Sequence, residues 1–123
     1  MEIIKLGLDE LKPYEKNAKR HTDEQIQHII NSIERFGMND PIGIWGEKNV
    51  IVEGHGRLMA AKKLGMEKVP VIHLDHLTDE QRRAYALAHN RTAELSEWDD
   101  VVKELELQGI KEIDMSRFGF DPT

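Results

Sequence analysis

A strand-to-helix turn in the middle of the chain carries the residues best suited to bind an anion. The run from Val50 to Gly65 reads VIVEGHGRLMAAKKLG, a β-type segment followed directly by an alanine-rich helical one. Gly54 and Gly56 allow positive φ and close approach of the backbone to a ligand. The first amides of a helix lack intrahelical partners and attract phosphate, and the guanidinium of Arg57 matches phosphate oxygens. The turn therefore predicts a phosphate site.

The same spacing has a second interpretation. Gly54 and Gly56 would serve only a tight turn, and Arg57 would be a solvated surface residue. Short glycine motifs often match by chance. Spacing alone leaves both interpretations open.

Two groups of side chains suggest a metal instead. His73, Asp75 and His76 stand at the exit of a predicted strand and are residue types that ligate transition metals. Glu53 and His55 lie at the glycine turn and are the candidate catalytic residues of a metal-dependent nuclease centre that would also include Asp75. In the alternative interpretation, all five are ordinary polar loop residues.

Basic side chains along the chain could line a groove that attracts phosphate. They are Lys19, Arg20, Arg57, Arg82, Arg83 and Arg91. For Arg82 and Arg83, pairing with Asp79 and Glu80 is an equally good interpretation. Trp98 begins an apolar stripe that continues at helical spacing through Val101, Val102 and Leu105, which predicts packing rather than base stacking.

Periodicity and capping patterns indicate the elements that position these residues. Capping boxes at 22–25 and 78–81 start two helices, and the first has an apolar face from Ile26 to Phe36 and ends at Gly37. Strands are expected within 2–8, 41–45, 50–53 and 69–74, a short helix over 58–64, and a third capped helix from 96–99. Pro70 favours an edge position, or the first residues of its strand. This order predicts an α+β fold, a compact domain with a small mixed sheet and flanking helices.

Composition limits the classes of protein to consider. The chain has 123 residues, 39% apolar and 33% charged, with no cysteine, so it is predicted to be a globular domain without disulfides or a thiolate nucleophile. No apolar run could cross a membrane and no secretory signal is present, so we expect no membrane partner and a cytoplasmic location. The net charge of −6 resides from Thr92 onward, where nine acidic residues face three basic ones, while residues 1–91 are neutral. Charge alone leaves a nucleic-acid partner open.

Several motifs, in the right order, resemble one known family. They are Asn17 to Arg20, Ser32-Ile33 through Gly37, Pro41-Ile42, Glu53 to Ala61, Leu64-Gly65, Val69 to Val71 and His89-Asn90-Arg91. Together they resemble the ParB N-terminal domain of the ParB/sulfiredoxin superfamily over residues 3–95. The form EGHGRLMAAKKLG is most similar to the phage and prophage variants of this domain.

The resemblance implies a nucleotide-binding fold that takes CTP with Mg²⁺, or ATP in some relatives. The family's second box reads Gly-Glu-Arg-Arg; here Gly54 and Arg57 match its ends, and His55 and Gly56 replace its middle. Asn90 carries over as a contact near phosphate and metal, while His89 replaces a glutamate, an oxygen ligand of the kind that Mg²⁺ prefers.

Further phosphate contacts implied by the resemblance are Asn17, Lys19, Arg20 and Arg91. Asn90 and Asp75 are candidate metal ligands. We expect the turn 54–57 and Asn90 to face one pocket, with the segment 17–20 closing one side of it.

The function that follows is a ParB-like domain that binds a nucleoside triphosphate or another phosphate ligand. It would serve a DNA-associated protein in partition, phage DNA modification or packaging, binding DNA through a larger protein and able to form a homodimer. The alternatives are a metal-dependent nuclease or nucleotide-using kinase, with NTP hydrolysis or DNA cleavage as the activity, and an interaction domain without a ligand. Neither methyltransferase nor sulfiredoxin activity is expected. The domain would cover 1–95, and 96–123 would be an acidic helical extension, the start of a linker.

Overall fold

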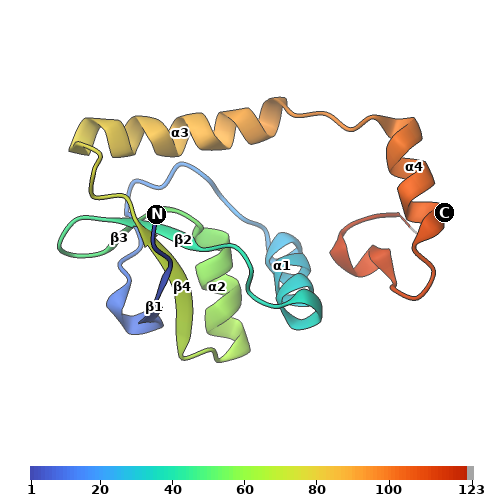
Figure 1. The fold of residues 1–123 in the computed structure, drawn as a ribbon, viewed down its shortest axis with the longest axis horizontal. Coiled ribbons are helices and arrows are strands. Elements are labelled where there is room, and N and C mark those ends of the chain that lie inside the picture. Colours follow the sequence, from blue (N-terminus) through green and yellow to red (C-terminus); the bar gives the residue numbers. More distant parts are fainter. Residues whose placement is uncertain (122–123) are drawn as a thin grey trace.

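Four strands form one mixed sheet in the computed structural model, which describes residues 1–121 (Figure 1). Residues 122 and 123, the end of the predicted extension 96–123, lie outside the described residues. The strands are β1 (Ile4–Gly7), β2 (Ile42–Trp45), β3 (Val50–Glu53) and β4 (Lys68–His73), in the spatial order β1-β4-β2-β3. The helices α1 (Asp23–Phe36), α2 (His55–Leu64), α3 (Asp79–Leu95) and α4 (Asp100–Gly109) complete the α+β fold that the sequence predicted.

The parallel pair in the sheet joins β2 and β4, while β1 pairs with β4 and β3 with β2 in antiparallel fashion. β4 therefore lies inside the sheet, so the edge position predicted for Pro70 is wrong, whereas the alternative prediction, among the first residues of its strand, is correct, because Pro70 is the third residue of β4. Pro70 is tolerated because pairing with β2 begins only at Val71, one residue later, so the missing amide of proline precedes that ladder.

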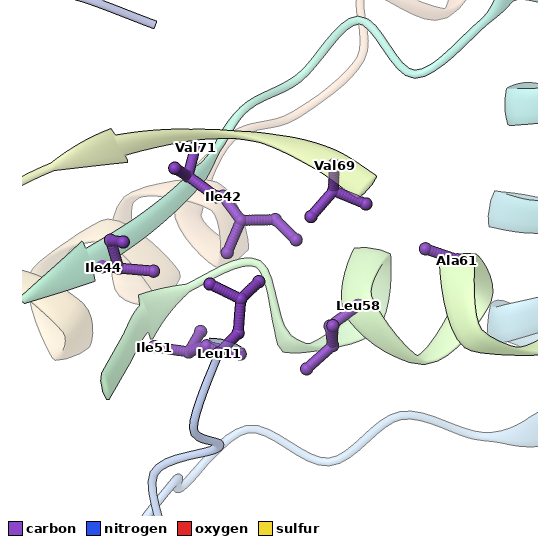
Figure 2. Close-up of a cluster of buried hydrophobic side chains, with 8 residues drawn as sticks. All are labelled: Leu11, Ile42, Ile44, Ile51, Leu58, Ala61, Val69 and Val71. Atoms are coloured by element: carbon purple, nitrogen blue, oxygen red, sulfur yellow. The ribbon is translucent and has the colours of Figure 1, made fainter. Parts of the chain in front are cut away.

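The main core lies between the sheet and α2. It consists of Leu11, Ile42, Ile44, Ile51, Leu58, Ala61, Val69 and Val71 (Figure 2). Side chains alternate between the two faces of a strand, so Ile42 and Ile44 project from the same face of β2 into this core. The strands and α2 bury their apolar side chains in the same core. This shared burial holds α2, and therefore its first turn, against the sheet.

A second, smaller core joins α1 to α2. Ile26, Ile30 and Ala60 are buried there. The capping box that starts α1 is present: the Gln25 amide donates to Thr22 Oγ1 and the Thr22 amide donates to Gln25 Oε1, each over 3.1 Å. This core places Ile29 of α1, and His21 just before it, beside Gly56 in the first turn of α2.

Beyond α3 the structure departs from the sequence-based expectations. α3 starts at its predicted capping box, has no buried residue, and lies across the top of the sheet in Figure 1, in contact with β3. The next helix begins at Asp100 with Asp99 as its N-cap, not at Ser96. Trp98 is 66% exposed and Val101 71% exposed, so the predicted packing of this stripe is wrong. A short 3₁₀ helix, η2 (Met115–Phe118), then returns to α1.

The division of the chain into a domain over 1–95 and an extension over 96–123 stays a prediction. Among residues 1–121, no helix is both long enough and apolar enough to cross a membrane.

Candidate functional site

A pocket of about 130 Å³ opens where α2 begins. This volume is below the roughly 300–1,000 Å³ that is usual for small-molecule sites, so a ligand larger than a phosphate group would extend beyond it. Its walls come from the segment before α1, from α1, from the β3–α2 turn and from α3. The lining residues are Asn17, Lys19, His21, Ile29, Val52, Glu53, Gly54, His55, Gly56, Arg57, His89 and Asn90. The turn 54–57 and Asn90 do face one pocket, with part of the segment 17–20 on one side.

The turn itself requires glycine at its first position. Gly54 is the N-cap of α2, with φ of 106° and ψ of 19°. A Cβ atom there would lie 3.0 Å from Arg57 Nη2 and 3.2 Å from Ile42 Cγ1. Because Gly54 brings no capping side chain, the first amides of α2 remain available at the pocket. α2 begins at His55, three residues earlier than the predicted Leu58, because Gly54 in its left-handed conformation is the residue that starts the helix.

Arg57 is held by the protein's own oxygen atoms. Its Nη2 donates to Pro41 O and to Glu53 Oε2, both over 2.9 Å. The Arg57 Nε is buried and has no hydrogen-bond partner among the described residues. Arg57 is therefore neither a solvated surface residue nor an unpaired cation, and its unpartnered N–H at Nε is buried within the protein.

His55 anchors the segment before α1 to the start of α2. The Tyr14 amide donates to His55 Nε2 over 3.1 Å, so the proton of the neutral ring lies on Nδ1.

Asn17 lines the pocket, yet its side-chain amide is used in a local turn. Its Nδ2 donates to Lys19 O over 3.0 Å, and its Oδ1 accepts from the Lys19 amide over 3.3 Å.

His21 is the pocket residue that the sequence reasoning missed. A Cβ atom on Gly56 would lie 3.0 Å from His21 Cε1 and 3.2 Å from its Nδ1. The imidazole therefore covers the first turn of α2 at the one position where the helix carries no side chain. In sequence, His21 is marked only by its place just before the N-cap Thr22, and the contact depends on the packing of α1 against α2.

The remaining predicted phosphate contacts lie outside this pocket. Arg20 lines an adjacent cavity, and Arg91 lines another, where it pairs with Glu94 at 3.3 Å. Arg82 donates to Asp79 Oδ1 through Nε and Nη2, over 3.0 and 2.8 Å. The pairing interpretation is thus correct for Arg82, and this side chain does not join Arg57 in one groove.

The predicted metal centre is not assembled. Asp75 accepts from the Gly46 amide over 2.8 Å, at the tip of the β2–β3 hairpin, whereas Glu53 and His55 lie at its other end. Over residues 1–121, no group of three or more His, Asp or Glu side chains could hold a metal ion. The candidate ligand Asn90 has no carboxylate beside it in the pocket except Glu53, which is bound to Arg57. The pocket therefore does not fit a protein-held Mg²⁺, which needs oxygen ligands.

The two partly buried histidines of the pocket, His21 and His55, favour their neutral forms. Burial lowers the pKa of His55; the nearby His21 lowers it further, and Glu53 acts in the opposite direction. Burial and the charge of Lys19 lower the pKa of His21. Both shifts favour neutral imidazoles at neutral pH.

These pKa shifts predict a stability that falls in mild acid. Because the folded pKa values lie below the unfolded value of about 6.5, the unfolded chain takes up protons first as the pH drops. The free energy of unfolding, measured by urea denaturation, should therefore decrease from pH 7 toward pH 5. The His55→Gln variant should show a smaller decrease, whereas His76→Gln, at an exposed loop position, should behave like the parent. An unchanged decrease in His55→Gln would contradict this origin.

Comparison with known proteins identifies the family of this chain. The sequence model of the family described as the ParB N-terminal domain matches residues 1–91. The chain belongs to this family. The observed order of strands and helices is thus that of a ParB N-terminal domain.

Relatives of this ParB-type domain differ in length. The chain is 47% identical over 83 residues to the ParB-like nuclease domain-containing protein YnaK of Escherichia coli, covering 68% of this chain and 94% of YnaK. It is 32% identical over 91 residues to a probable plasmid-partitioning protein ParB of Thermus thermophilus, covering 72% of this chain and 30% of that protein. The domain therefore spans nearly all of YnaK and under a third of the partition protein.

Solved structures share the fold. The truncated chromosome-partitioning protein ParB of Caulobacter crescentus, complexed with CTP-γ-S, has a TM-score of 0.77 at 19% identity, covering 91% of this chain and 64% of that one. Sulfiredoxin of Arabidopsis thaliana has a TM-score of 0.58 at 20% identity, covering 71% and 98%. A free serine kinase variant in complex with ADP has a TM-score of 0.53 at 26% identity, covering 64% and 34%.

Proposed function

We propose that the pocket at the start of α2 binds a nucleoside triphosphate, CTP or ATP, or another phosphate ligand. The observation that carries this proposal is the meeting, in one pocket, of uncapped α2 amides, the cations Arg57 and Lys19, and Asn90. Helix amides and cations are the groups that recognise phosphate oxygens. The CTP-γ-S and ADP complexes of structural neighbours support a nucleotide as the ligand.

We further propose that the domain serves a DNA-associated protein, in partition or in phage DNA modification or packaging. The named partition relatives and the family membership support this role. DNA contact would then come through a larger protein or assembly, since residues 1–91 are electrically neutral overall. A homodimer is part of the same proposal, because α4 leaves Val101 and Leu105 exposed.

A nuclease is the second candidate, favoured by the similarity to YnaK, a ParB-like nuclease domain-containing protein. Its predicted catalytic residues, Glu53 and His55, already have partners: the carboxylate binds Arg57, and the imidazole Nε2 accepts from Tyr14. We therefore rank phosphate binding first. Cleavage of plasmid DNA with Mg²⁺ or Mn²⁺ that Glu53→Gln abolishes would reverse this order.

Titration calorimetry with the four nucleoside triphosphates, with and without Mg²⁺, tests the proposed ligand. We expect saturable binding that Lys19→Ala and Asn90→Ala each weaken by about tenfold, the effect of losing one charge-assisted or polar contact to phosphate. Lys63→Ala is the matched control, since Lys63 is an exposed cation on α2 outside the pocket and should leave affinity unchanged. No binding of any nucleotide, or of tripolyphosphate, would refute the proposal.

A further inference from the structure

We propose that this pocket takes its phosphate ligand together with a proton, which His21 accepts, so that an imidazolium rather than a protein-held divalent metal balances the ligand's charge. The inference rests on the proposed function and specifies how that same site is regulated. It makes phosphate binding stronger in mild acid and independent of Mg²⁺.

Histidines are concentrated at this pocket. Three of the six in the chain line it, and each comes from a different part of the fold: His21 from the segment before α1, His55 from α2 and His89 from α3. Exposed His89 lies against the Tyr85 ring, with centroids 5.8 Å apart. Imidazole is the side chain whose charge changes most readily near neutral pH.

The permanent charges of the pocket are already partly compensated. Arg57 is 2.9 Å from the Glu53 carboxylate, and the Lys19 ammonium is 3.9 Å from Glu94. Glu53 is also the one carboxylate among the pocket's described lining residues. Both cations that line this pocket therefore already have an acidic partner, and its one carboxylate is bound to Arg57 rather than free to hold a metal. A group that gains a proton would add positive charge for the ligand without breaking either pair.

The environments of the two inner histidines differ in a way that selects His21. Protonation of His55 at Nε2 would remove the acceptor of the Tyr14 amide, so His55 is best suited to stay neutral and donate through Nδ1. Among residues 1–121, no hydrogen bond involves the His21 ring, which lies over Gly56 in the first turn of α2. His21 can therefore gain a proton without losing a contact, next to the amides that would hold the phosphate.

The charged groups around His21 allow its protonation state to change when a phosphate binds. The titratable and charged groups that line the two pockets touching it are Glu15, Lys19, Arg20, Glu53, His55, Arg57, Lys62 and His89. α1 contributes only apolar Ile29. Four cations against two carboxylates favour a neutral His21 in the free protein, in agreement with the lowered pKa that burial and Lys19 cause. A bound phosphate reverses this balance and raises that pKa again.

Proton uptake is measured by calorimetric titration of the full chain with CTP and with tripolyphosphate at pH 7, in buffers of different ionisation enthalpy, with EDTA present. We expect net uptake for the wild type and a loss of nearly one proton of that uptake in His21→Gln. Affinity should rise by up to about tenfold per pH unit between pH 8 and pH 6, the slope for one linked proton. Because the ligand's own protonation is common to both proteins, their difference isolates His21.

Two further measurements complete the test. His89→Gln should keep the uptake, which separates the exposed ring from the inner one. In the wild type, the NMR titration midpoint of the His21 Cε1–H signal should move to higher pH when ligand is added, a readout that does not depend on a variant folding. Equal proton uptake in His21→Gln, an unmoved His21 midpoint, or binding that requires Mg²⁺ would overturn the inference while leaving phosphate binding intact. Absence of binding under every condition would overturn both.

Discussion

Replacing Arg57 by methionine should destabilise the domain by about 2–4 kcal/mol, in addition to any loss of ligand binding. Arg57 satisfies Pro41 O and Glu53 Oε2, and the two side chains of the ion pair are only 25% and 15% exposed. Removing the cation leaves the Glu53 carboxylate and the Pro41 carbonyl without this partner in a partly desolvated site. The expected loss is below the roughly 3–5 kcal/mol of a fully buried pair because some solvent reaches it.

The measurement is the free energy of unfolding from urea denaturation, with the double variant Glu53→Gln/Arg57→Met as its control. The double variant should recover a large part of the stability, since it removes the unpaired charge along with its partner. If Arg57→Met alone were as stable as the wild type, Arg57 would be the solvated surface residue of the second interpretation. The structural account of the turn would then fail.

Replacing Gly54 by alanine should also cost about 2–4 kcal/mol, from two sources. The first is backbone strain, because φ is 106° at this residue and L side chains rarely adopt that value. The second is overlap with the core, since the new Cβ would meet Ile42 Cγ1 at 3.2 Å. Ile42 is fully buried and cannot move aside easily.

Gly65→Ala separates these two sources. Gly65 ends the same helix with φ of 72°, and a Cβ atom there would have no neighbour within 4 Å. It should therefore show strain alone, about 1 kcal/mol in urea denaturation. Equal losses at both glycines would mean that the overlap with Ile42 contributes nothing. In that case, the turn would tolerate a side chain beside the core.

His55 and Gly56 both join the start of α2 to the segment before α1. His55 accepts the Tyr14 amide, and Gly56 leaves space for the His21 ring. The segment before α1 is thus fitted to the start of α2 at two neighbouring positions, as close packing requires.

Local signals were sufficient for much of the fold. The capping boxes at Thr22 and Thr78 start α1 and α3, because a hydroxyl and a glutamine three residues apart satisfy helix amides wherever the helix lies. Gly65 ends α2 for an equally local reason, the low cost of positive φ. The stripe from Trp98 to Leu105 was misread because helical periodicity marks an apolar face but cannot say whether this chain covers it.

By itself, the sequence determined the family, the order of the elements and the presence of the glycine turn and Asn90 in one pocket. These properties depend on motifs and on backbone preferences that act over a few residues. Only the tertiary structure decided that Arg57 is bound by Glu53, that Asp75 lies at the far end of the hairpin, and that His21 covers Gly56. Each of these contacts joins residues from different elements, and their distances are set by how α1, α2 and the sheet pack around their shared cores.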